Sequence, residues 1–126
     1  MNKKLDTLIC HAGSDTEANF GIVNPPVYHA STVTAPTLDE YEGRGKNGYQ
    51  GVQYGRSGTP TTHAFEKAIT AMHKGHKTIA YPSGLAAITG TLISLLQKGD
   101  HLLMVDTTYQ PTRKRVCDYL LARSGV

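Results

Sequence analysis

Tryptophan is absent from this chain of 126 residues, and cysteine and phenylalanine occur only twice each. The two cysteines, Cys10 and Cys117, lie far apart in the sequence and belong to no CxxC or CxxH pair. No apolar run typical of a secretory signal peptide follows the charged start of the chain. We therefore expect both thiols to be reduced and the protein to be cytoplasmic.

Long apolar runs and an excess of one charge are also missing. The longest mostly apolar stretch, residues 85–96, is too short and too interrupted by Thr, Gly and Ser to span a bilayer. The net charge is only +3, and the basic cluster at residues 113–115 contains no stacking aromatics, so it is interpreted as a solvated helix face. Neither a membrane nor nucleic acid is expected as a partner.

Charge and metal-ligand patterns are scarce as well. Charged residues make up 18% of the chain, against about 25% in an average domain. This low content favours a chain that hides much of its surface against a partner or against sequence that is missing here. None of the six histidines shows ligand spacing, and Gly75 ends the helix that could have aligned His73 with His76. No metal site is therefore expected.

Glycine and proline are frequent in residues 1–60, where no sustained helical period is found. We expect this part to be an extended arm that lies on another subunit or on another domain, since a long structureless stretch inside a compact domain is uncommon. A short helix is predicted at residues 37–41, with Thr37 as its cap and Glu40 three residues later.

Residues 61–126 show a different pattern, with apolar stripes and short apolar runs. The helix after Thr61 or Thr62, either of which can cap it, should stop at Gly75. The expected order is helix 62–74, strand 77–81, helix 83–97, strand 101–106 and helix 111–123. This alternation predicts the start of a parallel α/β sheet. Two strands cannot cover the helix at 83–97, which is apolar on nearly every side, so we expect an incomplete domain.

The most informative string is residues 81–88, where a strand breaks at a proline and a Ser-Gly pair opens an apolar helix. The free N–H groups and the dipole of a helix start favour a phosphate or another anion. Ser83 and Gly84 are also ordinary capping residues, so taken alone the same string fits a simple turn between strand and helix.

Two further places could contribute to such a site. Arg56 and Tyr54 offer a guanidinium and a phenol that suit a phosphate, although a loop arginine is more often simply solvated. Tyr109 follows the second expected strand, where its ring could stack on a planar cofactor or pack on its own loop.

Taken together, these strings resemble the Cys/Met-metabolism family of pyridoxal-phosphate (PLP) enzymes over nearly the whole chain. The matching strings lie at residues 11–13, 23–28, 54–61, 81–88 and 98–101, and at Asp106 with Tyr109. Two variants, Tyr-Gly-Arg at 54–56 and Pro-Ser-Gly-Leu at 82–85, resemble the bacterial cystathionine β-lyase branch.

The resemblance implies roles for the candidate residues. The amides of Gly84 and Leu85 would hold the phosphate of the cofactor, pyridoxal 5'-phosphate. Tyr54 and Arg56 would reach that phosphate from a neighbouring subunit, and Tyr109 would stack on the pyridine ring and take part in catalysis by proton transfer. The implied fold is the aspartate aminotransferase-like PLP-dependent transferase fold (fold type I), assembled as homotetramers with shared active sites.

The implied reaction is β-elimination of cystathionine to homocysteine, pyruvate and ammonia. The resemblance places the Schiff-base lysine, the aspartate at the pyridine nitrogen and the arginine for the substrate carboxylate outside this chain. We therefore expect an N-terminal fragment that is inactive alone. The alternatives are a sister activity (cystathionine γ-synthase, cystathionine γ-lyase or methionine γ-lyase), a non-catalytic subunit that docks on a longer homologue, or a free-standing anion-binding module.

Overall fold

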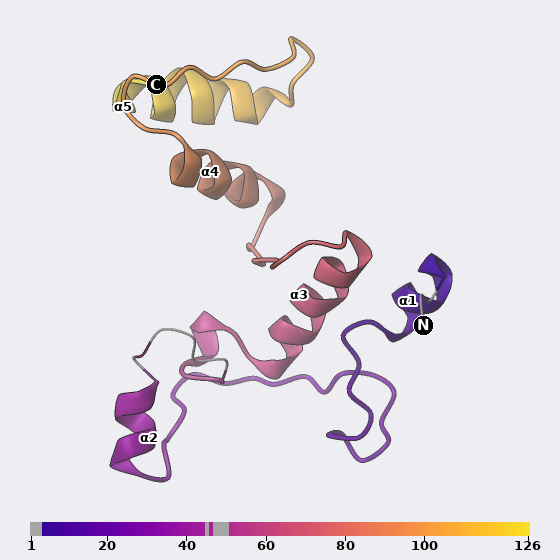
Figure 1. Ribbon diagram of the computed structural model, residues 1–126. Helices are drawn as coiled ribbons and strands as arrows, with labels where there is room; N and C mark the ends of the chain where they lie inside the picture. The colour runs from indigo at the N-terminus through magenta and orange to yellow at the C-terminus, as the bar shows by residue number, and fades with distance from the viewer. Residues whose placement is uncertain (1–3, 45, 47–50) are drawn as a thin grey trace. The chain divides into compact units, whose positions relative to one another are not determined.

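The computed structural model describes residues 4–44, 46 and 51–126, so parts of the expected arm at 1–3, 45 and 47–50 lie outside the described residues. The chain forms two compact units, Met1–Ile79 and Ala80–Val126, drawn from indigo to yellow in Figure 1. The sequence pattern predicts a domain boundary after residue 60 instead. No helix among the described residues has both the length and the apolar character needed to cross a membrane.

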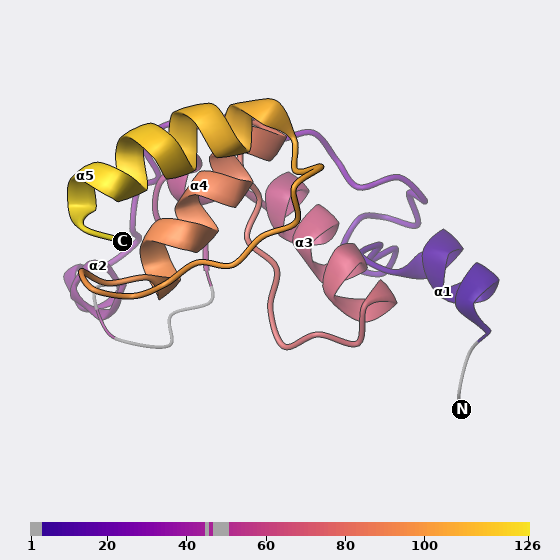
Figure 2. The ribbon, with the colours of Figure 1, turned by 90° about the horizontal axis from the view of Figure 1, so that it is seen from above.

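The first unit contains α1 (Leu5–His11), α2 (Leu38–Gly43), the 3₁₀ turn η1 (Gly55–Ser57) and α3 (Pro60–Met72). The helix α1 was not expected, and it packs on α3 (Figure 2). This contact places α3 with the N-terminal unit. It depends on Gly13, because a Cβ there would collide with the Ala64 carbonyl of α3.

The predicted short helix is confirmed as α2. Thr37 precedes it in an extended conformation, and its hydroxyl accepts a hydrogen bond of 3.2 Å from the Glu40 amide. This is the side-chain cap that the spacing of Thr37 and Glu40 predicted.

The helix α3 begins and ends differently from the prediction. It starts at Pro60, because the Thr61 hydroxyl is engaged elsewhere: it accepts from the Tyr28 amide at 2.8 Å and donates to the Pro26 carbonyl at 2.7 Å. At the other end Lys74, with φ of 51°, takes the left-handed position expected for Gly75. The Gly75 amide then closes the helix by donating to the Thr70 carbonyl at 3.0 Å.

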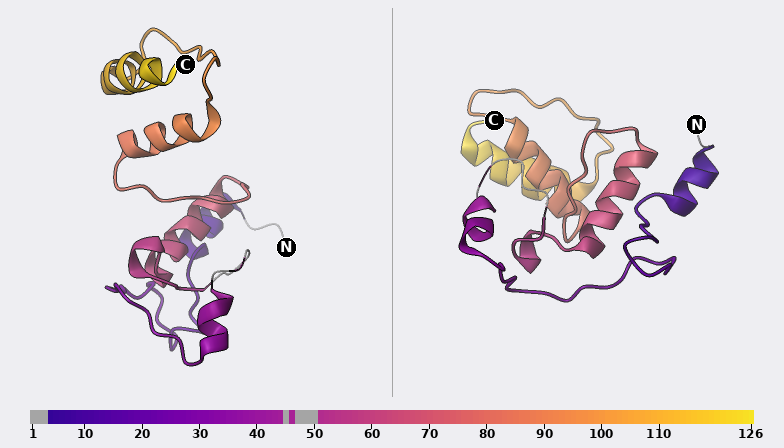
Figure 3. Two further views of the ribbon diagram at one scale, coloured as in Figure 1. Left: turned by 90° about the vertical axis from the view of Figure 1, so that its left-hand side faces the viewer. Right: turned by 60° about the horizontal axis from the view of Figure 1, so that its bottom comes forward.

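The second unit contains α4 (Gly84–Leu95), the π-helix η2 (Thr112–Leu121) and the short α5 (Ala122–Ser124). Helix η2 packs on α4 (Figure 3). The two expected helices at 83–97 and 111–123 are therefore present.

The two expected strands do not form. Neither 77–81 nor 101–106 pairs with another strand, and the one β-bridge among the described residues joins Thr32 to Tyr54. The physical reason is the lack of neighbours, since a strand exists through backbone hydrogen bonds to an adjacent strand. The apolar side chains of the second segment remain uncovered, and Leu103 is 88% exposed.

The hydrophobic core of the described residues is correspondingly small. Its buried apolar side chains are Val116 (2% exposed) and Leu121 (3% exposed), both on η2. Helix α4 has no buried residue, and Ile93 and Leu95 are exposed. An apolar pattern on nearly every side predicts a helix that is buried on both sides, and this prediction is wrong for α4, which has no buried residue among those that the structure describes.

Candidate functional site

The first turn of α4 presents two backbone amides that have no hydrogen-bond partner among the residues that the structure describes. Ser83 is extended, with φ of −158° and ψ of 159°, and its hydroxyl accepts a hydrogen bond of 3.1 Å from the Ala86 amide. The Ser83 carbonyl accepts from the Ala87 amide at 3.0 Å. Within the described part of the chain, the amides of Gly84 and Leu85 find no acceptor. These are the donors that a helix start offers to an anion.

The space at this helix start is open. Gly84 is exposed, and a Cβ built on it would meet no atom within 4 Å. No described atom therefore fills the space beside the Gly84 Cα where a side chain would stand. The serine-capped helix start that the sequence predicted is present at Ser83 and Gly84.

Tyr81 contributes to this site in a way that sequence reasoning missed. A Cβ at Gly90 would lie 2.7 Å from the Tyr81 hydroxyl oxygen, so the ring lies directly on the α4 backbone. The ring thereby fixes how the chain enters the helix. The signal was available in the sequence as a glycine within an apolar helix, which often marks a close contact.

Tyr54 and Arg56 lie together in the first unit. The Arg56 guanidinium carbon is 5.9 Å from the centroid of the Tyr54 ring, which is within cation–π range. Both side chains are exposed, and no carboxylate of the described residues forms an ion pair with Arg56. A cation and a phenol are thus available side by side for an anionic group.

A tight backbone contact holds this pair. Tyr54 forms the β-bridge with Thr32, and the Gly55 amide donates to the Ser31 carbonyl at 2.7 Å. A Cβ at Gly55 would collide with the Ala30 carbonyl oxygen. The glycine between Tyr54 and Arg56 is therefore required for the two chain segments to approach this closely.

Tyr109 lies at the end of a hydrogen-bonded turn in the second unit. The Thr108 hydroxyl donates to the Val105 carbonyl at 2.6 Å, and Arg113 pairs with the Asp106 carboxylate at 2.9 Å. The Tyr109 carbonyl accepts from the Thr112 amide at 2.9 Å. These contacts fix its backbone, while 63% of the residue is exposed. Its ring is therefore accessible for stacking.

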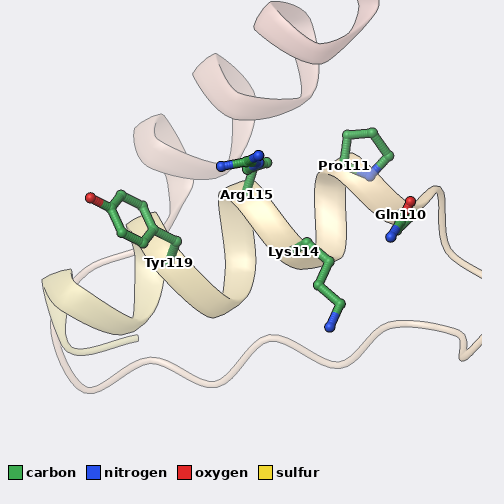
Figure 4. A pocket seen from close by; sticks show the side chains of 5 residues that line it. All are labelled: Gln110, Pro111, Lys114, Arg115 and Tyr119. Carbon is green, nitrogen blue, oxygen red and sulfur yellow. The ribbon is translucent and has the colours of Figure 1, made fainter.

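A shallow hollow of about 520 Å³ lies along η2 (Figure 4). It is lined by Gln110, Pro111, Lys114, Arg115 and Tyr119. None of the predicted site residues lines it. Arg123 covers the Tyr119 ring at 4.0 Å from the centroid and donates to its hydroxyl at 2.8 Å.

Two other residue types were considered for chemistry. Burial raises the pKa of the Cys117 thiol, and the neighbouring Asp118 carboxylate raises it further, so this thiol is held in its neutral form. Among the described residues, no three His, Cys, Asp or Glu side chains gather closely enough to hold a metal ion.

Comparison with known proteins decides the family. The model of the family described as Cys/Met metabolism PLP-dependent enzyme matches residues 6–126. The chain belongs to this family. Its cofactor is pyridoxal 5'-phosphate, and the open helix start at Gly84 and Leu85 fits the phosphate group of that cofactor.

Curated relatives within the family carry related names. The chain is 44% identical to a Rhizobium johnstonii protein provisionally named a cystathionine beta-lyase, covering 100% of this chain and 31% of that protein. It is 30% identical to cystathionine beta-lyase MetC of Escherichia coli, covering 99% of this chain and 32% of that protein. The chain thus spans about a third of the length of these relatives.

Solved structures confirm the fold class. Cystathionine gamma-lyase from Lactobacillus plantarum, complexed with L-serine, matches with a TM-score of 0.78 and 32% identity over 98% of this chain and 29% of that chain. The structure of metB from Corynebacterium glutamicum matches with a TM-score of 0.83 and 28% identity over 99% of this chain and 30% of that chain. The chain is therefore a partial α/β domain of the PLP-dependent fold type I.

Proposed function

We propose that this chain carries the phosphate-binding part of a PLP-dependent carbon–sulfur lyase. The observation that carries the proposal is the start of α4, where the amides of Gly84 and Leu85 have no acceptor among the described residues and a Cβ at the exposed Gly84 would meet no atom within 4 Å. Two amides and the positive end of a helix of 12 residues suit the dianionic phosphate of the cofactor.

Tyr54 and Arg56 complete the phosphate site from a neighbouring subunit in this proposal. Their support is the exposed pair itself, with the guanidinium 5.9 Å from the phenol ring and no competing carboxylate among the described residues. A guanidinium binds phosphate through parallel hydrogen bonds, and the phenol adds a donor. The glycine- and proline-rich arm, residues 1–60, would lie on that neighbour, and the assembly would be a homotetramer with shared active sites.

Tyr109 is proposed to stack on the pyridine ring of the cofactor and to move a proton during the reaction. Its exposed ring on a fixed backbone supports this role. The bound cofactor would supply an electron sink for the bonds at Cα of an amino-acid substrate. The protein's task is then to hold ring and phosphate in place.

The reaction proposed for the whole enzyme is the β-elimination of cystathionine with water to homocysteine, pyruvate and ammonia. Relatives named cystathionine beta-lyase support this choice. The chain alone is proposed to be inactive, since none of its lysines has the sequence context of the family's cofactor-linked lysine. There are two alternatives. The enzyme could catalyse a sister reaction of another thioether, or the chain could be a non-catalytic subunit that docks on a longer homologue. A cytoplasmic location is part of the proposal.

The decisive experiment removes one amide donor without removing the helix. Gly84→Pro deletes the N–H at the first helical position, where proline is well tolerated, and the extended Ser83 before it is compatible with proline. The matched control is Gly84→Ala, which keeps the N–H and finds open space for its methyl group. Both variants are titrated with pyridoxal 5'-phosphate and followed by absorbance.

We expect Gly84→Pro to weaken binding roughly tenfold or more, since a hydrogen bond to a charged group is lost. Gly84→Ala should bind within about threefold of the parent, and circular dichroism should show α4 intact in both. Equal affinity of the proline variant and the parent would overturn the proposed phosphate site. Pyruvate release from cystathionine by the purified chain would refute the proposed inactivity. Co-purification with a longer homologue would favour the subunit alternative.

A further inference from the structure

The Arg44 side chain makes three hydrogen bonds in the first unit, and the proposed function gives it no role. It is 9% exposed, although it is charged and stands at the end of a short surface helix. Its guanidinium donates to the Val33 carbonyl at 2.8 Å and to the Thr34 carbonyl at 2.9 Å. It also pairs with the Glu40 carboxylate at 3.2 Å. Charged side chains are rarely buried to this extent unless they are paired, as Arg44 is.

The partners of Arg44 lie next to the β-bridge that holds the candidate phosphate ligands. Val33 follows Thr32, which is one half of the bridge. On the other side, the Gln53 side chain donates to the Arg44 carbonyl at 2.7 Å, and Gln53 precedes Tyr54, the other half of the bridge. Arg44 is therefore bonded to the residue after one end of the bridge and to the residue before the other.

We propose that Arg44 is a positioning residue: it binds the chain on both sides of the bridge between Thr32 and Tyr54, so that Tyr54 and Arg56 present their side chains to the cofactor phosphate. The inference rests on the proposed function for the identity of the ligand. The geometric part stands on the hydrogen bonds of Arg44 alone. Arg44 itself does not touch the ligand in this proposal.

An arginine is needed for this role because two consecutive carbonyls must be satisfied at once. The planar guanidinium offers two N–H donors at fixed separation, which match the carbonyls of Val33 and Thr34. A lysine ammonium keeps the charge beside Glu40 but presents its donors from one point. Arg44→Lys therefore separates the effect of the charge from the effect of the two donors at fixed separation.

The first readout is local geometry, measured as hydrogen exchange of the Gly55 amide, which donates to the Ser31 carbonyl beside the bridge. In Arg44→Met we expect this amide to exchange about tenfold faster or more, because hydrogen bonds from a charged group are lost. Arg44→Lys should show an intermediate increase. Glu40→Gln, which removes the ion pair and keeps both carbonyl contacts, should leave the Gly55 amide within about twofold of the parent.

The second readout is the affinity for pyridoxal 5'-phosphate, with Arg56→Met as the reference for loss of a direct contact. Arg44→Met should weaken binding, while Arg123→Met, a matched arginine of the second unit, should not. If Arg56→Met leaves the affinity unchanged, the proposed function fails and the exchange data still decide the geometric role. If Arg44→Met fails to fold, Arg44→Lys carries both measurements.

One outcome would overturn the inference. In that outcome, replacement of Arg44 speeds hydrogen exchange at the α2 amides, while exchange at Gly55 and the cofactor affinity stay at the parent's values. Arg44 is then only the end cap of α2. Faster exchange at Gly55 together with weaker binding of pyridoxal 5'-phosphate, at an unchanged melting temperature for the second unit, supports the positioning role.

Discussion

The ring of Tyr81 lies on the backbone of α4 at Gly90, so closely that a Cβ there would sit 2.7 Å from the phenol oxygen. A contact this short leaves no room for a methyl group unless the ring moves. Because Tyr81 leads into Ser83 and Gly84, the contact connects the middle of α4 with the proposed phosphate site. The role of Gly90 is therefore tied to the orientation of the helix start.

The first prediction concerns Gly90→Ala. In an open helix position this change stabilises by about 0.5–1 kcal/mol, as we expect for the control Gly43→Ala in α2, where a Cβ meets nothing within 4 Å. At Gly90 the displaced Tyr81 ring should cancel or reverse that gain. Thermal denaturation followed by circular dichroism measures both. In a background with Tyr81→Ala, the change Gly90→Ala should stabilise the protein as it does at an open helix position. Stabilisation by Gly90→Ala in the presence of Tyr81 would contradict the contact between them.

The second prediction separates the cap from the anion site at Ser83. Ser83→Ala should destabilise α4 by about 1 kcal/mol, because the Ala86 amide loses its acceptor. Ser83→Asp should keep the cap and the stability, since aspartate caps as well as serine does. Its negative charge should nevertheless weaken pyridoxal 5'-phosphate binding by repulsion. Denaturation and cofactor titration test the two effects separately, and unchanged affinity in the aspartate variant would argue against an anion at this helix start.

Local signals in the sequence predicted the local features of the site well. The spacing of Thr37 and Glu40 predicted the cap of α2, and the Ser-Gly pair at 83–84 predicted the start of α4. Such caps depend on residues within one helical turn, so the sequence alone determines them. The helix predicted to run to residue 74 ends two residues earlier, at Met72, and the left-handed residue after it is Lys74 instead of Gly75.

Features that depend on distant partners could not be predicted in this way. The strands expected at 77–81 and 101–106 are unpaired, because strand formation requires neighbouring strands and the described residues offer none to them. The same holds for the burial of α4, whose apolar pattern was identified correctly while its cover is missing. The Arg44 contacts were missed because nothing local links residue 44 to the carbonyls at 33 and 34.

The third prediction concerns the Cys117 thiol, whose pKa is raised by burial and by Asp118. A thiol held neutral by the fold contributes stability below the ordinary thiol pKa, and this contribution is lost as the pH rises through the raised value. Cys117 should therefore react with iodoacetamide more slowly than the exposed Cys10 at mildly alkaline pH. Asp118→Asn should lower the pKa of Cys117 and speed its reaction. Mass spectrometry of the labelled peptides measures both rates, and equal rates at the two cysteines would contradict the protection.

The fourth prediction contrasts a covered with an uncovered apolar side chain in the second unit. Val116 is almost fully buried on η2, whereas Leu103 is almost fully exposed. Val116→Ala should lower the free energy of unfolding by about 1–3 kcal/mol, because it leaves a cavity in a very small core. Leu103→Lys should leave the free energy of unfolding within about 0.5 kcal/mol and reduce self-association of the chain, since it removes exposed apolar surface. Chemical denaturation and sedimentation measure these effects. A large loss of stability in Leu103→Lys would mean that the isolated chain covers this side chain after all, and that the strand segment at 101–106 has found a partner within it.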